Sequence, residues 1–303
     1  MNNAPFITIV VLNYNRAKDT IDCIQSINDI DYPNFVILLI DNCSTDNSVE
    51  ILRKQLKDLE IIKTEKNLGY TGGVNFGLKI AQEKQSDYIL LINNDTLVEK
   101  TFLIEMVSAM EKDQKVAVAC GTILCEQNRK EIWYAGGKIV KWRGLAVHKG
   151  KKSIFKYEKS NRPVYTTFVT GCMMLIRTKY LQEIGLEDER FFMYLDDIEL
   201  SARIQRKGYK LLYVPTSVIY HKVLDKDNSP FMLYYSVRNR LLLISLMLSS
   251  SMKLIANMYF LSVIMLKMII WKFINPRFYQ ASKYGLEDYF RKNFFKGRGF
   301  EFL

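Results

Sequence analysis

Short apolar runs alternate with amphipathic stretches over the first 120 residues of the chain. Unbroken apolar runs are typical of parallel strands that are buried on both faces, and the stretches between them have helical periodicity. This alternation predicts a parallel sheet flanked by crossover helices. The expected strands are Phe6–Leu12, Phe35–Ile40, Glu60–Lys63, Tyr88–Ile92 and Val116–Cys120. The expected helices are Ala17–Ile27, Thr45–Leu56, Gly73–Glu83 and Thr101–Glu111.

The pattern is weaker in the second part of the chain. Residues 122–164 contain Gly136-Gly137, spaced aromatics and a lysine cluster, which predict hairpins and loops over the sheet. The later expected elements are a buried strand at Gly171–Arg177, a helix at Asp196–Arg206, an extended segment at Lys210–His221 and helical structure from Pro230 to Ile274. We therefore expect an α/β fold with a mostly parallel, Rossmann-like sheet, followed by a helical C-terminal region.

Composition and cysteine usage indicate a globular protein that folds without disulfide bonds or a structural zinc. Of the 303 residues, 49% are hydrophobic and 25% are charged, which suffices for one large core or two modest ones. The five cysteines are scattered, form no CxxC pair and are expected to be reduced thiols. Residues 1–5 have neither a basic stretch nor a long apolar run. These features predict a cytoplasmic location.

The net charge of +11 is concentrated at the C-terminal end, where residues 222–303 hold thirteen Lys or Arg against five Asp or Glu. The stretch Leu241–Ile274 is strongly apolar and is interrupted by Lys253, Lys267 and Lys272. A lysine at the centre of a spanning helix costs about 2.5–3.5 kcal/mol, so this region is expected to lie on an anionic membrane surface rather than to cross it. The alternative is packing on the catalytic domain or in a homodimer. Nucleic acid is disfavoured because the lysines lie between long aliphatic runs.

Polar residues follow the predicted strands at the edge of the sheet where ligands of such folds bind. The first strand is followed by Asn13-Tyr14-Asn15 and not by a glycine-rich turn, and the chain has no Walker A lysine, which argues against dehydrogenases and P-loop enzymes. Asp41 ends the second strand, where its carboxylate can accept a hydrogen bond from the imide N–H of uracil or thymine. A helix cap near Ser44 or Thr45 explains this segment equally well.

Two further strand ends carry candidate chemistry. The third strand precedes the glycine-containing run 67–77, which can bring backbone close to a phosphate at a helix start. The fourth ends in Asn93-Asn94-Asp95, which can hold a hard cation if a substrate diphosphate supplies other ligands; a polar turn is the alternative. His221 is a candidate additional ligand, whereas His148 lies in a basic loop and is interpreted as an ordinary polar residue.

Three acids follow an aromatic cluster in the segment Phe191–Leu200. The helix dipole favours acids at a helix start, so a capping role explains part of this cluster. Successive helical residues point about 100° apart, so Asp196 and Asp197 cannot both face one sugar, and one of them is the working group. Glu199 and Arg203 are spaced for an ion pair that we expect to be structural.

Taken together, these motifs resemble the family 2 glycosyltransferases with the type-A nucleotide-binding fold, and most closely their rhamnosyltransferase-like branch. The resemblance covers Phe6 to Val223. Its motifs are V-V-L-N-Y-N, D-N-C-S-T-D, N-L-G-Y-T-G-G-V-N-F-G, L-I-N-N-D-T, T-G-C-M-M-L-I-R and F-F-M-Y-L-D-D-I-E-L, with a closing histidine. The resemblance implies a catalytic domain over residues 1–223, with a nucleotide-sugar half at about 1–120 and an acceptor half at about 121–223, before the membrane-associated region 224–303.

The resemblance also implies roles for individual residues. Asn13 and Asn15 border the nucleoside, and Asp41 binds the base. Asp95 holds Mg²⁺ or Mn²⁺ with His221, although Asn93 replaces the first aspartate of the family's Asp-x-Asp motif and leaves strict metal dependence open. The implied donor-binding residues are Asn13, Asn15, Asp41, Asn67, Gly73, Asn75, Asn94 and Asp95.

The pair Asp196-Asp197 matches the family's catalytic acids, and Asp197 corresponds to the general base. The implied function is inverting transfer of rhamnose or another hexose from a dTDP- or UDP-sugar to a carbohydrate or lipid-linked glycan. It would take place in cell-surface polysaccharide synthesis, at the inner face of the cell membrane. The alternatives are a sugar nucleotidyltransferase, whose early basic glycine-rich loop is missing here, and a catalytically silent carbohydrate- or lipid-binding module of the same fold.

Overall fold

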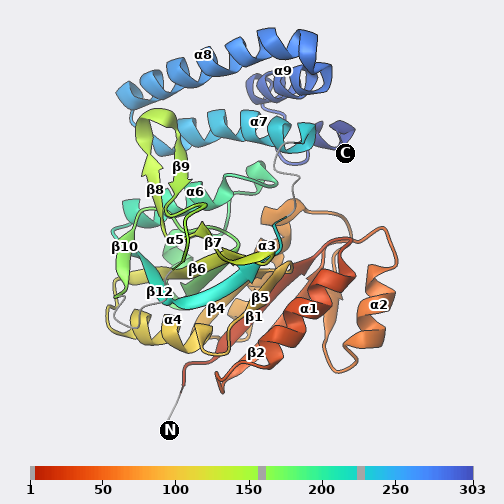
Figure 1. The fold of residues 1–303 in the computed structure, drawn as a ribbon, viewed down its shortest axis with the longest axis vertical. Helices are drawn as coiled ribbons and strands as arrows, with labels where there is room; N and C mark the ends of the chain where they lie inside the picture. The colour runs from red at the N-terminus through yellow and green to blue at the C-terminus, as the bar shows by residue number, and fades with distance from the viewer. Residues whose placement is uncertain (1–3, 156–161, 224–228, 303) are drawn as a thin grey trace.

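The computed structural model describes residues 4–155, 162–223 and 229–302 (Figure 1). Its first part is the expected alternation of parallel strands and helices, which confirms the α/β prediction. The strands are β1 (Ile7–Asn13), β2 (Phe35–Asp41), β3 (Ile61–Lys63) and β4 (Tyr88–Asn93). The helices between and after them are α1 (Ala17–Asn28), α2 (Ser48–Gln55), α3 (Gly69–Glu83) and α4 (Phe102–Glu111). The strand register pairs Asn13 with Asp41 and Leu12 with Asn93, so three strand ends meet at one edge.

The second part extends the same sheet. The strand order is β10-β12-β6-β11-β4-β1-β2-β3, with β5 on β12 and β7 on β6. The strand β11 runs antiparallel to both β4 and β6, whereas β12 runs parallel to β6 along most of its length. The added strands are β5 (Thr96–Val98), β6 (Val116–Cys125), β7 (Asn128–Tyr134), β10 (Val164–Thr166), β11 (Met173–Arg177) and β12 (Lys210–His221). One continuous sheet therefore runs through both predicted halves.

The expected hairpins also form. The strands β8 (Gly137–Val140) and β9 (Leu145–His148) pair as an antiparallel hairpin with a short 3₁₀ turn, η1 (Lys141–Arg143), at its tip. The short elements that follow are η2 (Thr178–Tyr180), α5 (Leu181–Ile184), η3 (Glu189–Phe191) and α6 (Asp196–Arg206). The predicted bounds of α6 are confirmed, whereas the strand predicted to end at Cys120 continues to Cys125.

Two predicted helix starts are wrong. The helix α3 begins at Gly69 rather than Gly73, because side chains bind the N–H groups at that point: Leu68 N–H donates to Asn42 Oδ1 at 3.0 Å, and Gly69 N–H donates to Asn67 Oδ1 at 2.8 Å. The helix α2 begins at Ser48 rather than Thr45. The carboxylate of Asp41 accepts a hydrogen bond from the backbone N–H of Ser44 at 2.9 Å and holds that segment in a turn.

The C-terminal region is a layer of three helices at the end of the molecule away from the N-terminus (Figure 1). They are α7 (Pro230–Met247), α8 (Ser250–Ile274) and α9 (Pro276–Phe290), followed by η4 (Gly299–Phe302). The helix α9 lies beyond the predicted helical region, although Asn275 followed by Pro276 is a helix-start signal and the Asn275 side chain caps Phe278 N–H. Because Leu242 and Leu243 of α7 join the main core, this layer is packed on the sheet domain. The predicted division at residue 223 stays a prediction.

Candidate active site

A chain of hydrogen bonds links the polar residues at the ends of β1, β2 and β4. Asn94 Nδ2 donates to Thr20 Oγ1 at 2.8 Å, and Thr20 Oγ1 donates to Asn13 Oδ1 at 2.7 Å. Asn13 Nδ2 then donates to Asp41 Oδ2 at 2.8 Å. Thr20, Asn13 and Asp41 are fully buried, and buried polar groups are stable when they are paired in this way. The network fixes three of the predicted donor-binding residues relative to one another.

Asp41 makes two more contacts, both with Ser44. The Ser44 N–H donates to Oδ1, and the Ser44 hydroxyl donates to Oδ2 at 2.6 Å. A carboxylate has about four acceptor positions, and fully buried Asp41 uses three of them within the protein. Asn15 lies beside this turn, where its Oδ1 accepts from Thr45 N–H at 2.8 Å. The structure thus brings Asn13, Asn15 and Asp41 together.

The loop after β3 is fastened by a residue that the sequence analysis missed. Asn42 Nδ2 donates to the carbonyl of Gly69 at 2.9 Å, and its Oδ1 accepts from Leu68 N–H at 3.0 Å. Asn67 Oδ1 accepts from Gly69 N–H at 2.8 Å. The position of Asn42, directly after Asp41 at a strand end, was the sequence signal for this role. Asn67 therefore lies in a fixed loop beside the β2 end.

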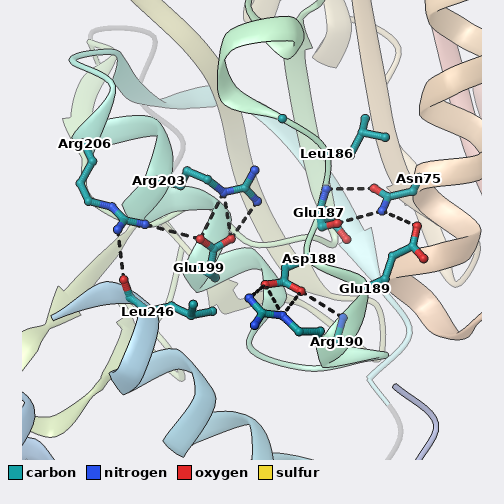
Figure 2. Close-up of a pocket in the computed structure, with 11 residues that line it drawn as sticks. Asn75, Leu186, Glu187, Asp188, Glu189, Arg190, Glu199, Arg203, Arg206 and Leu246 are labelled. Carbon is teal, nitrogen blue, oxygen red and sulfur yellow. Dashed lines mark hydrogen bonds and ion pairs between the residues drawn. The ribbon is translucent and has the colours of Figure 1, made fainter. Parts of the chain in front are cut away.

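Gly73 and Asn75 lie not in that loop but in α3, within the predicted helix Gly73–Glu83, and their role in donor binding stays a prediction. Both are buried residues of α3. Asn75 Nδ2 donates to the carbonyl of Glu187 at 2.8 Å, and Asn75 Oδ1 accepts from Glu187 N–H at 2.9 Å (Figure 2). Nδ2 also donates to Glu189 Oε1 at 3.0 Å. The Asn75 side chain is thereby engaged in holding the segment before α6.

Asp95 and His221 come together from the end of β4 and the end of β12. His221 Nε2 lies 3.2 Å from Asp95 Oδ1, and the His221 ring packs against Trp133 with 4.8 Å between centroids. Asp95 Oδ1 and His221 Nδ1 are buried atoms that have no hydrogen-bond partner among the described residues. Adjacent ligands of an octahedral Mg²⁺ lie about 3 Å apart, so the pair fits one edge of a hard-cation site.

The protein supplies only part of such a site. Within residues 4–155, 162–223 and 229–302, no group of three or more His, Cys, Asp or Glu side chains could hold a metal ion. Asp95 and His221 fit a metal whose remaining ligands come from a bound diphosphate and water, the usual arrangement for Mg²⁺ in phosphate chemistry.

Asp196 and Asp197 begin α6, and they differ in accessibility. Asp196 is 4% exposed, whereas Asp197 is partly exposed and its Oδ2 accepts from Gly171 N–H at 3.1 Å. Tyr70, from the first turn of α3, donates its hydroxyl to the Gly171 carbonyl at 2.8 Å. Burial raises the pKa of both carboxyl groups, and the Asp197 charge raises the pKa of Asp196 further. Asp197 is the accessible acid, and it adjoins the start of α3.

The outer face of α6 forms the wall of a separate cavity of about 690 Å³ (Figure 2). The predicted structural ion pair is confirmed there: Arg203 Nη2 lies 2.8 Å from Glu199 Oε2. Glu187 also lines this cavity; it is 4% exposed, and neither carboxylate oxygen has a hydrogen-bond partner among the described residues. Burial, together with the charges of Asp196 and Asp197, raises the pKa of Glu187. The sequence analysis missed this buried acid.

Solved structures similar to this chain share its fold. A crystal structure of GalNAc-T7 with UDP, GalNAc and Mn²⁺ superposes with a TM-score of 0.61 at 20% identity, covering 78% of this chain and 48% of that one. The mannosyltransferase PcManGT from Pyrobaculum calidifontis, in complex with GDP-Man and Mn²⁺, gives 0.59 at 12% identity, covering 96% and 88%. The expected type-A glycosyltransferase fold is therefore confirmed.

Sequence relatives agree with the fold. A poly-beta-1,6-N-acetyl-D-glucosamine synthase of Staphylococcus epidermidis is 23% identical over 70% of this chain, which spans about half (48%) of that relative's length. An N-acetylglucosaminyl-diphospho-decaprenol L-rhamnosyltransferase of Mycobacterium tuberculosis is 22% identical over 64% of this chain and 69% of its own length. The model of glycosyl transferase family 2 matches residues 8–185, more than half of the chain. The protein belongs to glycosyl transferase family 2.

Proposed function

We propose that the protein is an inverting, metal-dependent glycosyltransferase of cell-surface polysaccharide synthesis. It moves a hexose from a pyrimidine nucleoside diphosphate sugar to a glycan hydroxyl. The observation that carries the proposal is a series of hydrogen bonds that links the segments bearing Asp41, Asp95 and Asp197. The hydrogen-bonded chain ending at Asn94 joins Asp41 to the Asp95 turn. Asn93 N–H donates to the Cys172 carbonyl, and Gly171 N–H donates to the Asp197 carboxylate, so that turn is joined to the acids of α6.

Asp197 is proposed as the general base. An acceptor hydroxyl is a weak nucleophile near neutral pH, and a carboxylate that takes its proton during attack contributes about 10²- to 10⁴-fold. The new bond forms between the acceptor oxygen and the anomeric carbon, while the bond from that carbon to the diphosphate oxygen breaks on the opposite side. A raised pKa suits Asp197 to this role because it increases its proton affinity.

Donor recognition follows from the edge of the sheet. We propose that the base binds beside the Asn13–Asp41–Ser44 cluster, which favours a UDP- or dTDP-sugar, dTDP-rhamnose included. Asp41 is fully buried, so the imide N–H of uracil or thymine reaches its fourth acceptor position only after Asn13 or Ser44 moves aside. Asp95 and His221 would bind Mg²⁺ or Mn²⁺ together with the diphosphate, and the ion would neutralise charge on the leaving group. The fixed loop at Asn67 borders the same edge.

A donor screen tests this function. Thermal unfolding is followed with UDP, dTDP and GDP, each with and without Mn²⁺, and transfer from the matching sugars is then assayed. A nucleotide at 100 times its Kd stabilises the fold by about 2.7 kcal/mol. Stabilisation by UDP or dTDP that needs Mn²⁺, with release of the nucleoside diphosphate, supports the proposal. Release of pyrophosphate would indicate a nucleotidyltransferase, and glycan binding without turnover would indicate a silent module.

We further propose that α8 rests on an anionic membrane surface at the inner face of the cell membrane, with a lipid-linked glycan as one acceptor class. One face of α8 packs on α7 through Ala256, Phe260, Ile264 and Met268. The other face exposes a row of large apolar side chains: Leu254, Ile255, Met258, Met265, Leu266, Ile269, Ile270, Phe273 and Ile274. Among the described helices, α8 alone is long and apolar enough to span a membrane.

Attachment to the surface is favoured over spanning. The α8 helix carries three lysines and is packed along one side, and Trp142 at the tip of the β8–β9 hairpin is 49% exposed and contacts Tyr259 of α8. Tryptophan and lysine are favoured where apolar and aqueous phases meet. The excess of positive charge after residue 222 suits anionic lipid, with each basic residue near the surface contributing about 1 kcal/mol.

A further inference from the structure

The loop that leads into the two acids of α6 has an unusual backbone. Phe192, Tyr194 and Leu195 have φ values of 63°, 66° and 68°. Residues with a side chain rarely adopt this left-handed region, and such conformations persist when surrounding contacts hold them. Leu195 is the N-cap of α6, so the direction in which Asp196 and Asp197 point depends on this loop.

Two consecutive residues of α7 hold the loop by its carbonyl groups. Asn239 Nδ2 donates to the carbonyls of Phe191, Met193 and Tyr194 at 2.9, 2.7 and 3.0 Å. Arg238 Nη2 donates to the carbonyls of Phe191 at 2.9 Å and Arg190 at 3.2 Å. The two side chains are also bonded to each other, because Arg238 Nε donates to Asn239 Oδ1 at 3.0 Å. The backbone carbonyls of Arg190, Phe191, Met193 and Tyr194 are thereby held by α7.

The environment of Arg238 suits this task better than a role in an ion pair. Arg238 is fully buried and donates hydrogen bonds to neutral groups: three backbone carbonyls, with Phe295 as the third at 2.7 Å, and the Asn239 amide. The rings of Tyr234 and Tyr235 lie 5.5 and 4.9 Å from its guanidinium carbon. The planar guanidinium of arginine has five N–H donors and can bond several carbonyls at once. The single ammonium nitrogen of lysine cannot reach the same set of carbonyls.

The opposite side of the loop contacts the start of α3. Thr71 N–H donates to the Phe192 carbonyl at 3.2 Å, and a Cβ on Gly69 would lie 2.5 Å from Phe192 Cδ2. The loop is therefore held between α7 and the helix that follows the predicted donor loop.

We propose that Arg238 and Asn239 are positioning residues for sugar transfer, which hold the segment 190–195 in the conformation that directs Asp197 toward Gly171 and the acceptor oxygen. This inference rests on the proposed function, since it gives these two residues a part in the same reaction. It makes α7 a component of the catalytic unit.

Arg238→Lys and Asn239→Ala test the proposal, with Arg240→Gln as the matched control. Arg240 is also an arginine of α7 bonded to a backbone carbonyl, but it contacts Arg143 in the hairpin turn and not the loop. We expect kcat to fall by about 10- to 100-fold in the two loop variants, with the donor Kd within about twofold of wild type. The control should keep kcat within about twofold.

The pH profile separates positioning from a loss of folded protein. Because the hydrogen bond from Gly171 lowers the pKa of Asp197, loosening that contact should move the acidic limb of the rate profile to higher pH in the loop variants only. A smaller fraction of folded protein would lower the rate by the same factor at every pH and leave the acidic limb where it is. An unmoved limb, or a kcat equal to that of the control, overturns the proposal.

Hydrogen exchange tests the positioning role without an activity assay, so its result does not depend on whether the proposed function is right. Amide protection over residues 190–197 should decrease in Arg238→Lys and Asn239→Ala and stay unchanged in Arg240→Gln. If the wild-type chain transfers no sugar from any donor, the proposed function fails by itself. Equal protection in all variants overturns the positioning role whether or not transfer is seen.

Discussion

The imidazole of His221 lies 3.2 Å from the carboxylate of Asp95. The end of β12 and the turn after β4 therefore present one nitrogen and one oxygen ligand side by side. His221 pairs with Thr96 in the β12–β5 register, and this pairing sets the separation. A two-ligand site of this kind binds a cation weakly until a diphosphate completes it. Metal and donor binding should therefore depend on each other.

Asp95→Ala tests that dependence. Removing one of the two protein ligands should weaken nucleoside diphosphate binding by about 10- to 100-fold in Mn²⁺ and leave the weak binding in EDTA unchanged. Titration calorimetry under both conditions measures the difference. The control is Asp58→Ala, which removes an exposed carboxylate. Unchanged, metal-independent affinity in Asp95→Ala would contradict the assignment.

Asp197→Asn should abolish proton removal while leaving donor binding within about twofold of wild type. We expect transfer to fall by at least about 10²-fold, since a general base contributes about that much. Asp196→Asn serves as the matched control: Asp196 is nearly inaccessible, so its variant should retain more activity. Steady-state rates and donor affinities of both variants decide the roles. Greater loss in Asp196→Asn would assign the base to Asp196 instead.

The transfer rate should fall on the acid side at a higher pH than an ordinary aspartate would give. A general base must be ionised, and burial raises the pKa of Asp197 above the usual value of about 4. The rate should therefore decline as pH falls through that raised pKa. The titratable groups that interact with Asp197 are Asp196, Glu187, Tyr70, Tyr134 and Cys172. A kcat/KM profile that stays flat down to pH 4.5 would contradict this prediction.

Glu187 should make the fold less stable as pH rises. Its pKa is higher in the folded chain than in the unfolded chain, so the folded state binds more protons between the two values and the free energy of unfolding decreases with pH there. Glu187→Gln removes this titration, and its melting temperature should exceed that of wild type by about 2 °C or more at pH 9. Glu83→Gln, at an exposed position, is the control. Parallel melting curves for wild type and Glu187→Gln from pH 5 to 9 would refute the prediction.

Charges on the exposed face of α8 should prevent membrane attachment. Leu266 and Ile270 are 63% and 55% exposed, so replacing both by glutamate should leave the fold intact while abolishing flotation with anionic liposomes. Ile51→Glu places a charge at an exposed position on α2 and should not affect flotation. Unchanged flotation of the double variant would count against attachment through α8. If wild type is a dimer, the double variant is a monomer and neither binds liposomes, this face of α8 is a homodimer interface instead.

Much of the sheet was predictable because strands buried on both faces consist of continuous apolar residues. The strand-end residues Asn13, Asp41 and Asp95 were also predictable, since parallel strands bring their carboxyl ends together. The start of α3 was predicted four residues too late: Gly69 and Gly72 are typical turn residues, and only a long-range contact such as that of Gly69 with Phe192 accounts for their place in the helix.

The contacts that were missed join segments far apart in the chain. Asn239 bonds carbonyls about 45 residues earlier: the stretch Tyr234–Asn239 resembles one in this family branch, but helical periodicity does not show which distant segment its side chains contact. Glu187 was missed for a related reason. Its burial depends on the packing of the segment before α6 against α3, whereas a glutamate in an acidic run is normally expected at the surface.

The strand β11 lies between β4 and β6 and is bonded antiparallel to each, so the two predicted halves of the catalytic domain share one set of main-chain bonds. A chimera that joins residues 1–120 of this protein to the second half of a relative would have to match both edges of that strand. Exchange of whole halves is therefore a poor route to new specificity in this scaffold. Acceptor preference should be altered instead by grafting peripheral pieces, such as the β8–β9 hairpin, that leave β11 in place.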